Sequence, residues 1–139
     1  MMCVFCAIVA GEVPSSLVHE DDRAIAFMDL RPVTPGHLLV IPRRHAAMLD
    51  DLDPADAERM MSVAQHLARA LRRSTVPTDG INLLLADGAA AGQEVFHCHL
   101  HVIPRTARDG LVIDAPFVSP PRSELDAHAE AIRSALGPQ

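Results

Sequence analysis

The pattern of apolar and polar positions predicts a chain of mixed helix and strand. Apolar-rich runs at 17–20 and 24–29, separated by three charged residues, predict the two strands of a hairpin. Runs rich in leucine and β-branched residues predict buried strands at 36–42 and 80–86, and a further strand at 95–104. Turn-forming proline and glycine residues bound several of these runs, so each is short, as strands are.

A long amphipathic helix is predicted at 54–73. Asp53 can cap its first amides, and Pro54 suits the first helical position. One apolar face then recurs at helical spacing, through Met60, Ala64, Leu67, Ala68 and Leu71. A second helix is predicted at 123–136.

Strands that follow one another with few helices between them indicate an α+β fold with an antiparallel sheet. A doubly wound parallel sheet would need a helix between most strands, and the intervening segments are too short. The 139 residues predict a single domain, 1–139.

Charge and composition restrict the function classes. The net charge is −6 and the chain has no Tyr or Trp, which argues against a nucleic-acid surface built on basic stripes or stacking aromatics. No apolar run is long enough for a membrane span, and the first residues lack a basic secretory region. We therefore expect a cytoplasmic protein with no membrane partner.

Three cysteines add candidate chemistry. Cys3 and Cys6 form a C-x-x-C pair, and Cys98 stands alone. In a cytoplasmic protein the pair indicates a metal or redox site, with two incidental thiols as the alternative.

The stretch HCHLHVIPR places His97, His99 and His101 at alternate positions. On a strand these three share one face, and the outer two lie about 13 Å apart, too far to bind one metal ion. Cys98, Leu100 and Val102 then face the core. A merely solvated strand face is the alternative, and three alternating histidines after a glycine-containing loop disfavour it.

Several segments in order resemble the histidine triad (HIT) family, whose signature is H-φ-H-φ-H-φ-φ with φ apolar. The matching segments are Cys3–Ile8, Gly11–Ser15, Glu20–Asp22, Ala26–Asp29, Pro35–Pro42 and Ala91–Arg105. The Cys pair points to the bacterial zinc-containing branch. The resemblance implies a HIT-like sheet of about five antiparallel strands with a central and a C-terminal helix. Residues 105–139 form a tail that diverges from the family pattern.

The resemblance implies a hydrolase that cleaves at the α-phosphorus of purine nucleotide conjugates, such as an adenosine phosphoramidate, and releases AMP. His99 would be the nucleophile and form a covalent nucleotidyl intermediate. His101 and His37 would stabilise the phosphate, and Gln93 would approach the scissile bridge. A dinucleoside polyphosphate hydrolase or nucleotidyl transferase, or a nucleotide- or zinc-binding regulatory protein with negligible turnover, stays open.

The resemblance also assigns substrate contacts. Asp29 would bind the ribose hydroxyls, Asn82 the ribose-phosphate region, and the Gly92–Glu94 amides the phosphate. Glu94 stands where animal members of the family often have Ser or Thr, so a role in assisting the leaving group does not carry over directly. The base pocket would consist of Phe5, Ile8, Phe27 and Leu30, each of which could equally be plain core.

Zinc is the implied cofactor. Cys3, Cys6, His45 and His97 match a closed Cys2His2 set, which suits a structural ion. In the alternative, His97 only orients His99. The resemblance finally implies a homodimer that pairs the 54–73 helix and a strand across a twofold axis.

Overall fold

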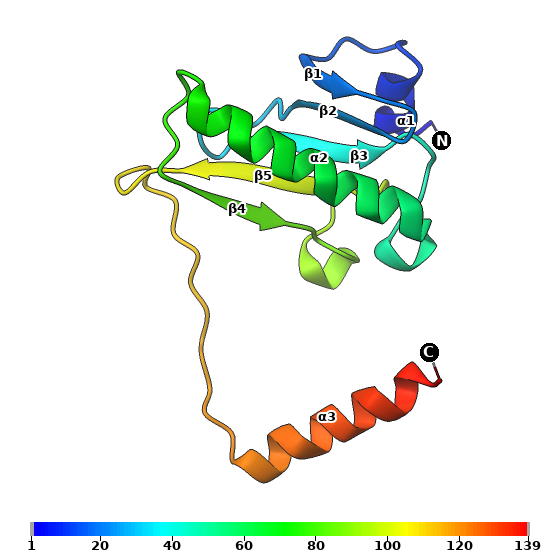
Figure 1. Ribbon diagram of the computed structural model, residues 1–139, viewed down its shortest axis with the longest axis vertical. Helices are drawn as coiled ribbons and strands as arrows, with labels where there is room; N and C mark the ends of the chain where they lie inside the picture. Colours follow the sequence, from blue (N-terminus) through cyan, green and yellow to red (C-terminus); the bar gives the residue numbers. More distant parts are fainter. Residues whose placement is uncertain (1, 139) are drawn as a thin grey trace.

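The computed structural model describes residues 2–138 of the chain. Five strands form one antiparallel sheet in the order β1-β2-β3-β5-β4. Their bounds are β1 (Leu17–Glu20), β2 (Ala24–Met28), β3 (Leu38–Pro42), β4 (Gly80–Leu84) and β5 (Leu100–Arg105). The predicted α+β fold with an antiparallel sheet is therefore confirmed (Figure 1).

The long helix α2 (Pro54–Arg73) has the bounds that the sequence predicts. The Asp53 side chain accepts a hydrogen bond of 2.8 Å from the Ala55 amide, as expected of an N-cap. The apolar face of α2 covers one face of the sheet (Figure 1). Burying this face, rather than intrinsic propensity, is what stabilises such a helix.

Two apolar clusters lie on opposite faces of the sheet. The larger lies under α2 and includes Cys98, Leu100 and Val102, which confirms the predicted core direction of these three residues. The smaller lies under a short helix, α1 (Val4–Val9), and contains Phe5, Ile25, Phe27, Leu39 and Ile41. The predicted histidine site lies on this second side.

Strand β5 begins later than the sequence predicts. The predicted strand covers 95–104, whereas β5 starts at Leu100, so His97 and His99 precede it. The ladder between β3 and β5 runs from Leu38 to Val40, and the Cys98 amide donates to the Ala46 carbonyl instead of to a strand. The prediction that all three histidines share one strand face is thus wrong, because only His101 lies in a strand.

Helix α1 was not predicted. It has six residues and no side-chain cap, so neither length nor capping signals it. The single-turn helices Leu49–Asp51 and Ala89–Ala91 are also too short for a periodic pattern. No helix among the described residues combines the length and apolar character that crossing a membrane requires.

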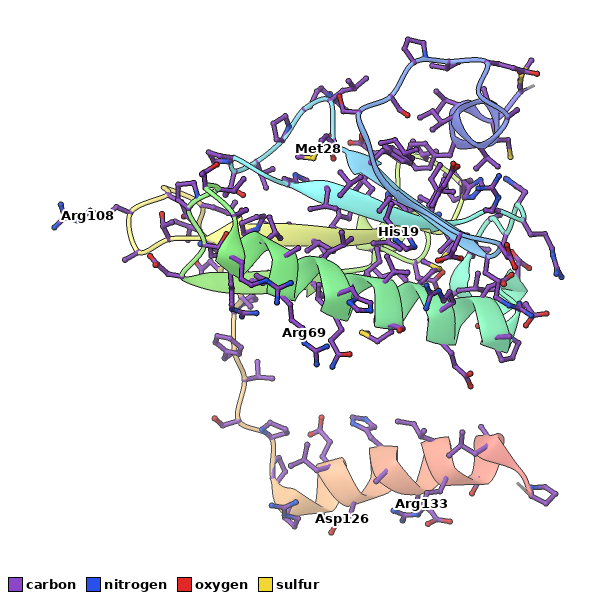
Figure 2. The ribbon with its side chains drawn as sticks, turned by 45° about the horizontal axis from the view of Figure 1, so that its top comes forward. His19, Met28, Arg69, Arg108, Asp126 and Arg133 are labelled. Carbon is purple, nitrogen blue, oxygen red and sulfur yellow. The ribbon has the colours of Figure 1, made fainter. Side chains whose placement is uncertain are left out.

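The chain divides into a body, residues 2–105, and an arm, residues 106–138. The arm contains an extended stretch and helix α3 (Arg122–Leu136), which stands apart from the body (Figure 1). Figure 2 shows the same separation with side chains drawn, and Asp126 and Arg133 lie on the outer side of α3. No residue of α3 is buried.

Candidate active site and metal centre

A cleft of about 520 Å³ opens between α1, the β2–β3 turn and the loop before β5. It has a mixed lining, with apolar side chains on the α1 side and histidines opposite. The lining residues are Val4, Phe5, Ile8, Val13, Pro14, Ser15, Phe27, Met28, Asp29, Leu30, Arg31, Val33, His37, Leu39, Gly92, Glu94, Val95, His99 and His101. Its size suits a small organic ligand such as a mononucleotide.

Ten of the residues proposed for catalysis or substrate binding line this cleft together. They are Phe5, Ile8, Phe27, Asp29, Leu30, His37, Gly92, Glu94, His99 and His101. Gln93 and Asn82 do not line it.

The tautomer of His99 is fixed by the main chain. Its Nδ1 lies 2.7 Å from the His97 carbonyl oxygen, which can only accept, so Nδ1 carries the proton. Nε2 is then left with a free lone pair. A neutral imidazole held in this way can act as a nucleophile.

His37 and His101 form a second polarised pair. The Val33 amide donates to His37 Nδ1 at 3.1 Å, so in the neutral ring the His37 proton is on Nε2. His37 Nε2 lies 2.8 Å from His101 Nδ1 and donates to it. His101 consequently carries its own proton on Nε2. The pair thus presents a hydrogen-bond donor, His101 Nε2–H, beside His99. The ring centroids of His99 and His101 are 5.0 Å apart.

Burial keeps these rings neutral. It lowers the pKa of His101 to about 4, and the neighbouring His99 and His37 lower it further, while Asp29 acts in the opposite direction. Burial also lowers the pKa of His37, against an opposing effect of Asp29. At neutral pH the His37–His101 pair therefore offers a neutral donor, the Nε2–H of His101.

The turn before β3 places His37. Gly36 has a φ of +87°, and a Cβ there would lie 2.5 Å from Val76 Cγ1. The position thus requires glycine both for its backbone conformation and for its close approach. His37 lies 3.5 Å from the Asp29 carboxylate, which belongs to the same turn.

Gln93 braces the loop before β5 and does not face the cleft. Its Oε1 accepts from the Gly88 amide at 2.8 Å, and its Nε2 donates to the Ala47 and Val95 carbonyls at 2.7 and 3.1 Å. The side chain is buried. These bonds hold the Gln93 side chain within the loop. The structure therefore does not place it where it would approach a scissile bond in the cleft.

Asn82 lies in β4, away from the cleft. Its Oδ1 accepts from Arg105 at 2.7 Å, and Arg105 also pairs with Asp109 at 2.6 Å. Asn82 therefore helps to fix the point where the arm leaves the body. The expected contact with the ribose-phosphate region finds no support in this placement.

Glu94 meets a cation at the mouth of the cleft. Its carboxylate lies 3.3 Å from the Arg31 guanidinium, and both side chains are largely exposed. Pairing with Arg31 reduces the repulsion that an isolated carboxylate would exert on a phosphate. Arg31 had no signal in the sequence beyond its charge, because only the folded turn brings it to the cleft.

A second group lies behind His99. The Sγ atoms of Cys3 and Cys6 are each 3.5 Å from His97 Nδ1. His45 Nδ1 is 3.4 Å from Cys6 Sγ and 3.2 Å from His97 Nδ1. Tetrahedral zinc, with bonds of about 2.3 Å to sulfur and 2.0 Å to nitrogen, would place its ligand atoms roughly 3.3–3.8 Å apart.

The ligand chemistry of this group fits a metal. His97 is fully buried, and its Nε2 donates to the Pro42 carbonyl at 2.8 Å, which leaves Nδ1 unprotonated toward the other three residues. Burial and the adjacent Cys3 raise the pKa of Cys6, so a cation is what would favour two thiolates side by side. The structure thus brings together all four residues that the sequence assigned to zinc.

Asp29, His37 and His101 also lie close enough to share an ion. The hydrogen bonds already account for them, since His37 Nε2 must carry a proton while Val33 donates to Nδ1. A metal at His37 Nε2 would displace that proton and leave the Val33 amide facing another N–H.

Comparison with known proteins identifies the family. The HIT domain model matches residues 10–108 of the chain. Together with the five-stranded antiparallel fold and the histidine-lined cleft, this match defines the class. The chain belongs to the HIT family.

Relatives and solved structures extend the comparison. The adenylylsulfatase HINT3 of Arabidopsis thaliana is 41% identical over 109 residues, which are 78% of this chain and 55% of that protein. A zinc-bound histidine triad family protein of Mycobacterium smegmatis is 43% identical, with a TM-score of 0.76 and 96% of each chain covered. A histidine triad nucleotide-binding protein of Candida albicans is 29% identical, with a TM-score of 0.88 and 97% of each chain covered.

Proposed function

We propose that this protein hydrolyses purine nucleotide conjugates at the α-phosphorus, with adenosine phosphoramidates as the substrate type and AMP as the product. The observation that carries the proposal is the hydrogen bond of 2.7 Å from His99 Nδ1 to the His97 carbonyl. It leaves a nucleophilic nitrogen in a cleft of mononucleotide size. The Candida albicans relative, which is named a nucleotide-binding protein, supports the ligand class.

The reaction proceeds in two displacements. His99 Nε2 attacks the α-phosphorus, the bond from phosphorus to the leaving nitrogen breaks, and the departing amine takes a proton from solvent. Water then attacks the nucleotidyl-His99 intermediate, which releases AMP and restores the imidazole. The Nε2 proton of His101 would stabilise charge on the phosphoryl oxygens, with His37 holding His101 in that tautomer.

The remaining lining residues would bind the nucleoside. Asp29 would accept from the ribose hydroxyls, and Phe5, Ile8, Phe27 and Leu30 would enclose the base. The amides of Gly92 and Gln93 already donate to the Ala89 and Gly88 carbonyls, so the Glu94 amide is the one of this stretch that would donate to the phosphate. Gln93 is proposed as a positioning residue, because its buried amide ties that loop to Gly88 and Ala47.

A zinc ion held by Cys3, Cys6, His45 and His97 is part of the proposal. Its four protein ligands leave no open position, so the ion would supply structural stabilisation and not catalysis. The zinc-bound Mycobacterium smegmatis relative supports this assignment.

The decisive test uses an adenosine phosphoramidate with the wild type and His99→Ala. We expect the variant to lose hydrolysis and to retain AMP binding, with a nucleotidyl-protein intermediate trapped in the wild type alone. His66→Ala, an exposed histidine on α2, is the matched control. Equal hydrolysis rates for His99→Ala and wild type would refute the nucleophile assignment.

Other leaving groups are second candidates. The adenylylsulfatase relative acts by name on a substrate with an anionic leaving group, and Arg31, which pairs with Glu94, is a cation at the mouth of the cleft. Values of kcat/KM for an adenosine phosphoramidate, adenylyl sulfate and a diadenosine polyphosphate decide between phosphoramidase and polyphosphate hydrolase or transferase. Tight AMP binding without turnover of any of the three would favour a regulatory protein.

We further propose a homodimer. Strand β4 is an edge strand, and beside it α2 and β4 form a groove of about 400 Å³ whose lining includes Met61, Ala68, Ile81 and Leu83. A second copy lying on this edge would cover the groove. Light scattering should give twice the chain mass of 15.0 kDa, and Leu83→Arg should reduce it. A wild-type monomer at micromolar concentration would refute the dimer.

The cytoplasm is the compartment we propose. Cys3, Cys6 and Cys98 are all free thiols, and the first two are only half-buried. An oxidising compartment would act on such thiols, whereas a reducing one keeps them available as metal ligands.

A further inference from the structure

Helix α1 belongs to both the metal group and the cleft. Cys3, directly before it, and Cys6, within it, face the metal group, while Val4, Phe5 and Ile8 line the cleft. The two sites therefore share one element of six residues.

This element cannot be stable by itself. Helices much shorter than about 12 residues are unstable in water, and α1 has no capping side chain. Its attachments to the body are apolar contacts, from Phe5, Ala7, Ile8 and Val9, and the approach of the two thiols to His45 and His97. A metal ion would convert that approach into bonds.

Phe5 is the direct link between the sites. Its ring lies edge-on to His97, with centroids 5.9 Å apart, and to His99 at 5.2 Å. It also packs edge-on against Phe27 at 5.5 Å. A shift of α1 would move the wall of the proposed base pocket and remove the edge-on contact of Phe5 with both histidine rings.

His97 is the second link. Its side chain faces the metal group, while its carbonyl accepts a hydrogen bond from the Nδ1–H of His99. Holding the His97 side chain fixes the carbonyl that sets the tautomer of the nucleophile. His97 is thus a positioning residue for His99.

We propose that metal at Cys3, Cys6, His45 and His97 and a nucleotide in the cleft bind with positive coupling, because each orders α1 for the other. The inference rests on the proposed nucleotide site and deepens it. Coupling of this kind is reciprocal, so metal must raise nucleotide affinity by the factor by which nucleotide raises metal affinity.

The experiment uses the full chain and measures both effects, that of metal on nucleotide affinity and that of nucleotide on metal affinity. Calorimetry gives the Kd of AMP for zinc-loaded and chelator-stripped protein, and competition with a chromophoric chelator gives the Kd of zinc with and without AMP. We expect both ratios to agree at about tenfold or more, within the usual range of coupling factors. Hydrogen exchange should show residues 4–9 protected by zinc, and more so by zinc with AMP.

Variants distinguish the contact between the two sites, made by Phe5, from the metal ligands themselves. Phe5→Leu keeps all four metal ligands, so zinc should still bind while the coupling factor falls several-fold. Cys6→Ser should weaken both zinc and AMP binding, and His66→Ala should change neither. The chelator competition begins from loaded protein, so it gives a result even where the stripped protein unfolds.

The outcomes distinguish the two proposals. AMP affinity that is equal with and without zinc, or zinc affinity unaffected by saturating AMP, would overturn the coupling and leave the nucleotide site standing. Failure of the zinc-loaded protein to bind AMP at all would overturn the proposed function and the coupling with it.

Discussion

Two amphipathic helices of this chain have very different surroundings. Helix α2 buries Met60, Val63, Ala64, Leu67 and Leu71 against the sheet. Helix α3 carries a comparable stripe, Leu125, Ala129, Ile132 and Leu136, and buries none of it. An apolar stripe therefore predicts a helix and the direction of its contacts, but it does not predict which molecule supplies them.

The contrast extends to the whole body and arm. The body contains the cleft, the metal group and both apolar clusters. The extended part of the arm leaves Val112, Ile113, Phe117 and Val118 between 69% and 93% exposed. The candidate chemistry thus lies in the body, whereas the arm carries apolar side chains that are exposed in the single chain.

Removing the nucleophile gives the largest expected difference between the two regions. His99→Ala should lower kcat by about 10⁴-fold or more, as loss of a nucleophile does in other enzymes. Ile132→Ala in the arm should leave kcat within about twofold, because no arm residue lines the cleft. Single-turnover kinetics with an adenosine phosphoramidate measure both. A large loss of kcat in Ile132→Ala would contradict the assignment of the catalytic residues to the body alone.

Truncating an apolar side chain should destabilise the protein much more in α2 than in α3. Leu67→Ala in α2 should lower the free energy of unfolding by about 2–5 kcal/mol through lost burial and a cavity. The Ile132 side chain in α3 is 63% exposed, so Ile132→Ala should lower the free energy of unfolding much less. Urea denaturation at several protein concentrations measures both.

Acid should destabilise the body. An unfolded histidine titrates near pH 6.5, whereas burial lowers the pKa of His101 to about 4 in the folded chain. Between these values the unfolded state binds more protons, so the free energy of unfolding falls as the pH falls from about 6.5 to 4. The lowered pKa of His37 acts in the same direction.

Urea denaturation between pH 7 and pH 4.5 measures this dependence. His101→Asn should flatten it, and His128→Asn on the exposed α3 should leave it unchanged. An unchanged slope in His101→Asn would show that other groups cause the loss.

The smallest effect is expected at the junction of body and arm. The Asp109 carboxylate accepts a hydrogen bond from the Arg105 guanidinium. This bond holds the pKa of the Asp109 carboxyl well below its usual range. Asp109→Ala should speed hydrogen exchange of residues 106–111 without changing AMP affinity. Weaker AMP binding would show that the arm acts on the cleft after all.

The sequence predicted those elements whose pattern is long or bounded. The bounds of α2 follow from its cap, its proline and its apolar face, and β1, β2 and β3 follow from apolar runs between turn residues. Helix α1 was missed because its stability depends on contacts with distant residues. The start of β5 was misplaced because the Cys98 amide bonds to Ala46 instead of continuing a ladder.

The candidate site came from the family resemblance and not from periodicity. Strand geometry alone put His97, His99 and His101 on one face, but the backbone turns before β5. The resemblance gathered Cys3, Cys6, His45 and His97 correctly, as the structure brings them within ligand distance. It did not anticipate that Gln93 and Asn82 lie outside the cleft lining, because their hydrogen-bond partners are loop backbone groups and Arg105, which no motif specifies.

Hydrogen bonds from the main chain carry a practical consequence for mutational scanning. The protons of His97, His99 and His37 are placed by the Pro42 carbonyl, the His97 carbonyl and the Val33 amide. Exchanging the side chain at position 33 leaves that amide in the chain, so an alanine scan would not test this hydrogen bond. Replacing the peptide bond of Val33 by an ester, which removes the N–H alone, would reveal a contribution that no natural codon can delete except proline.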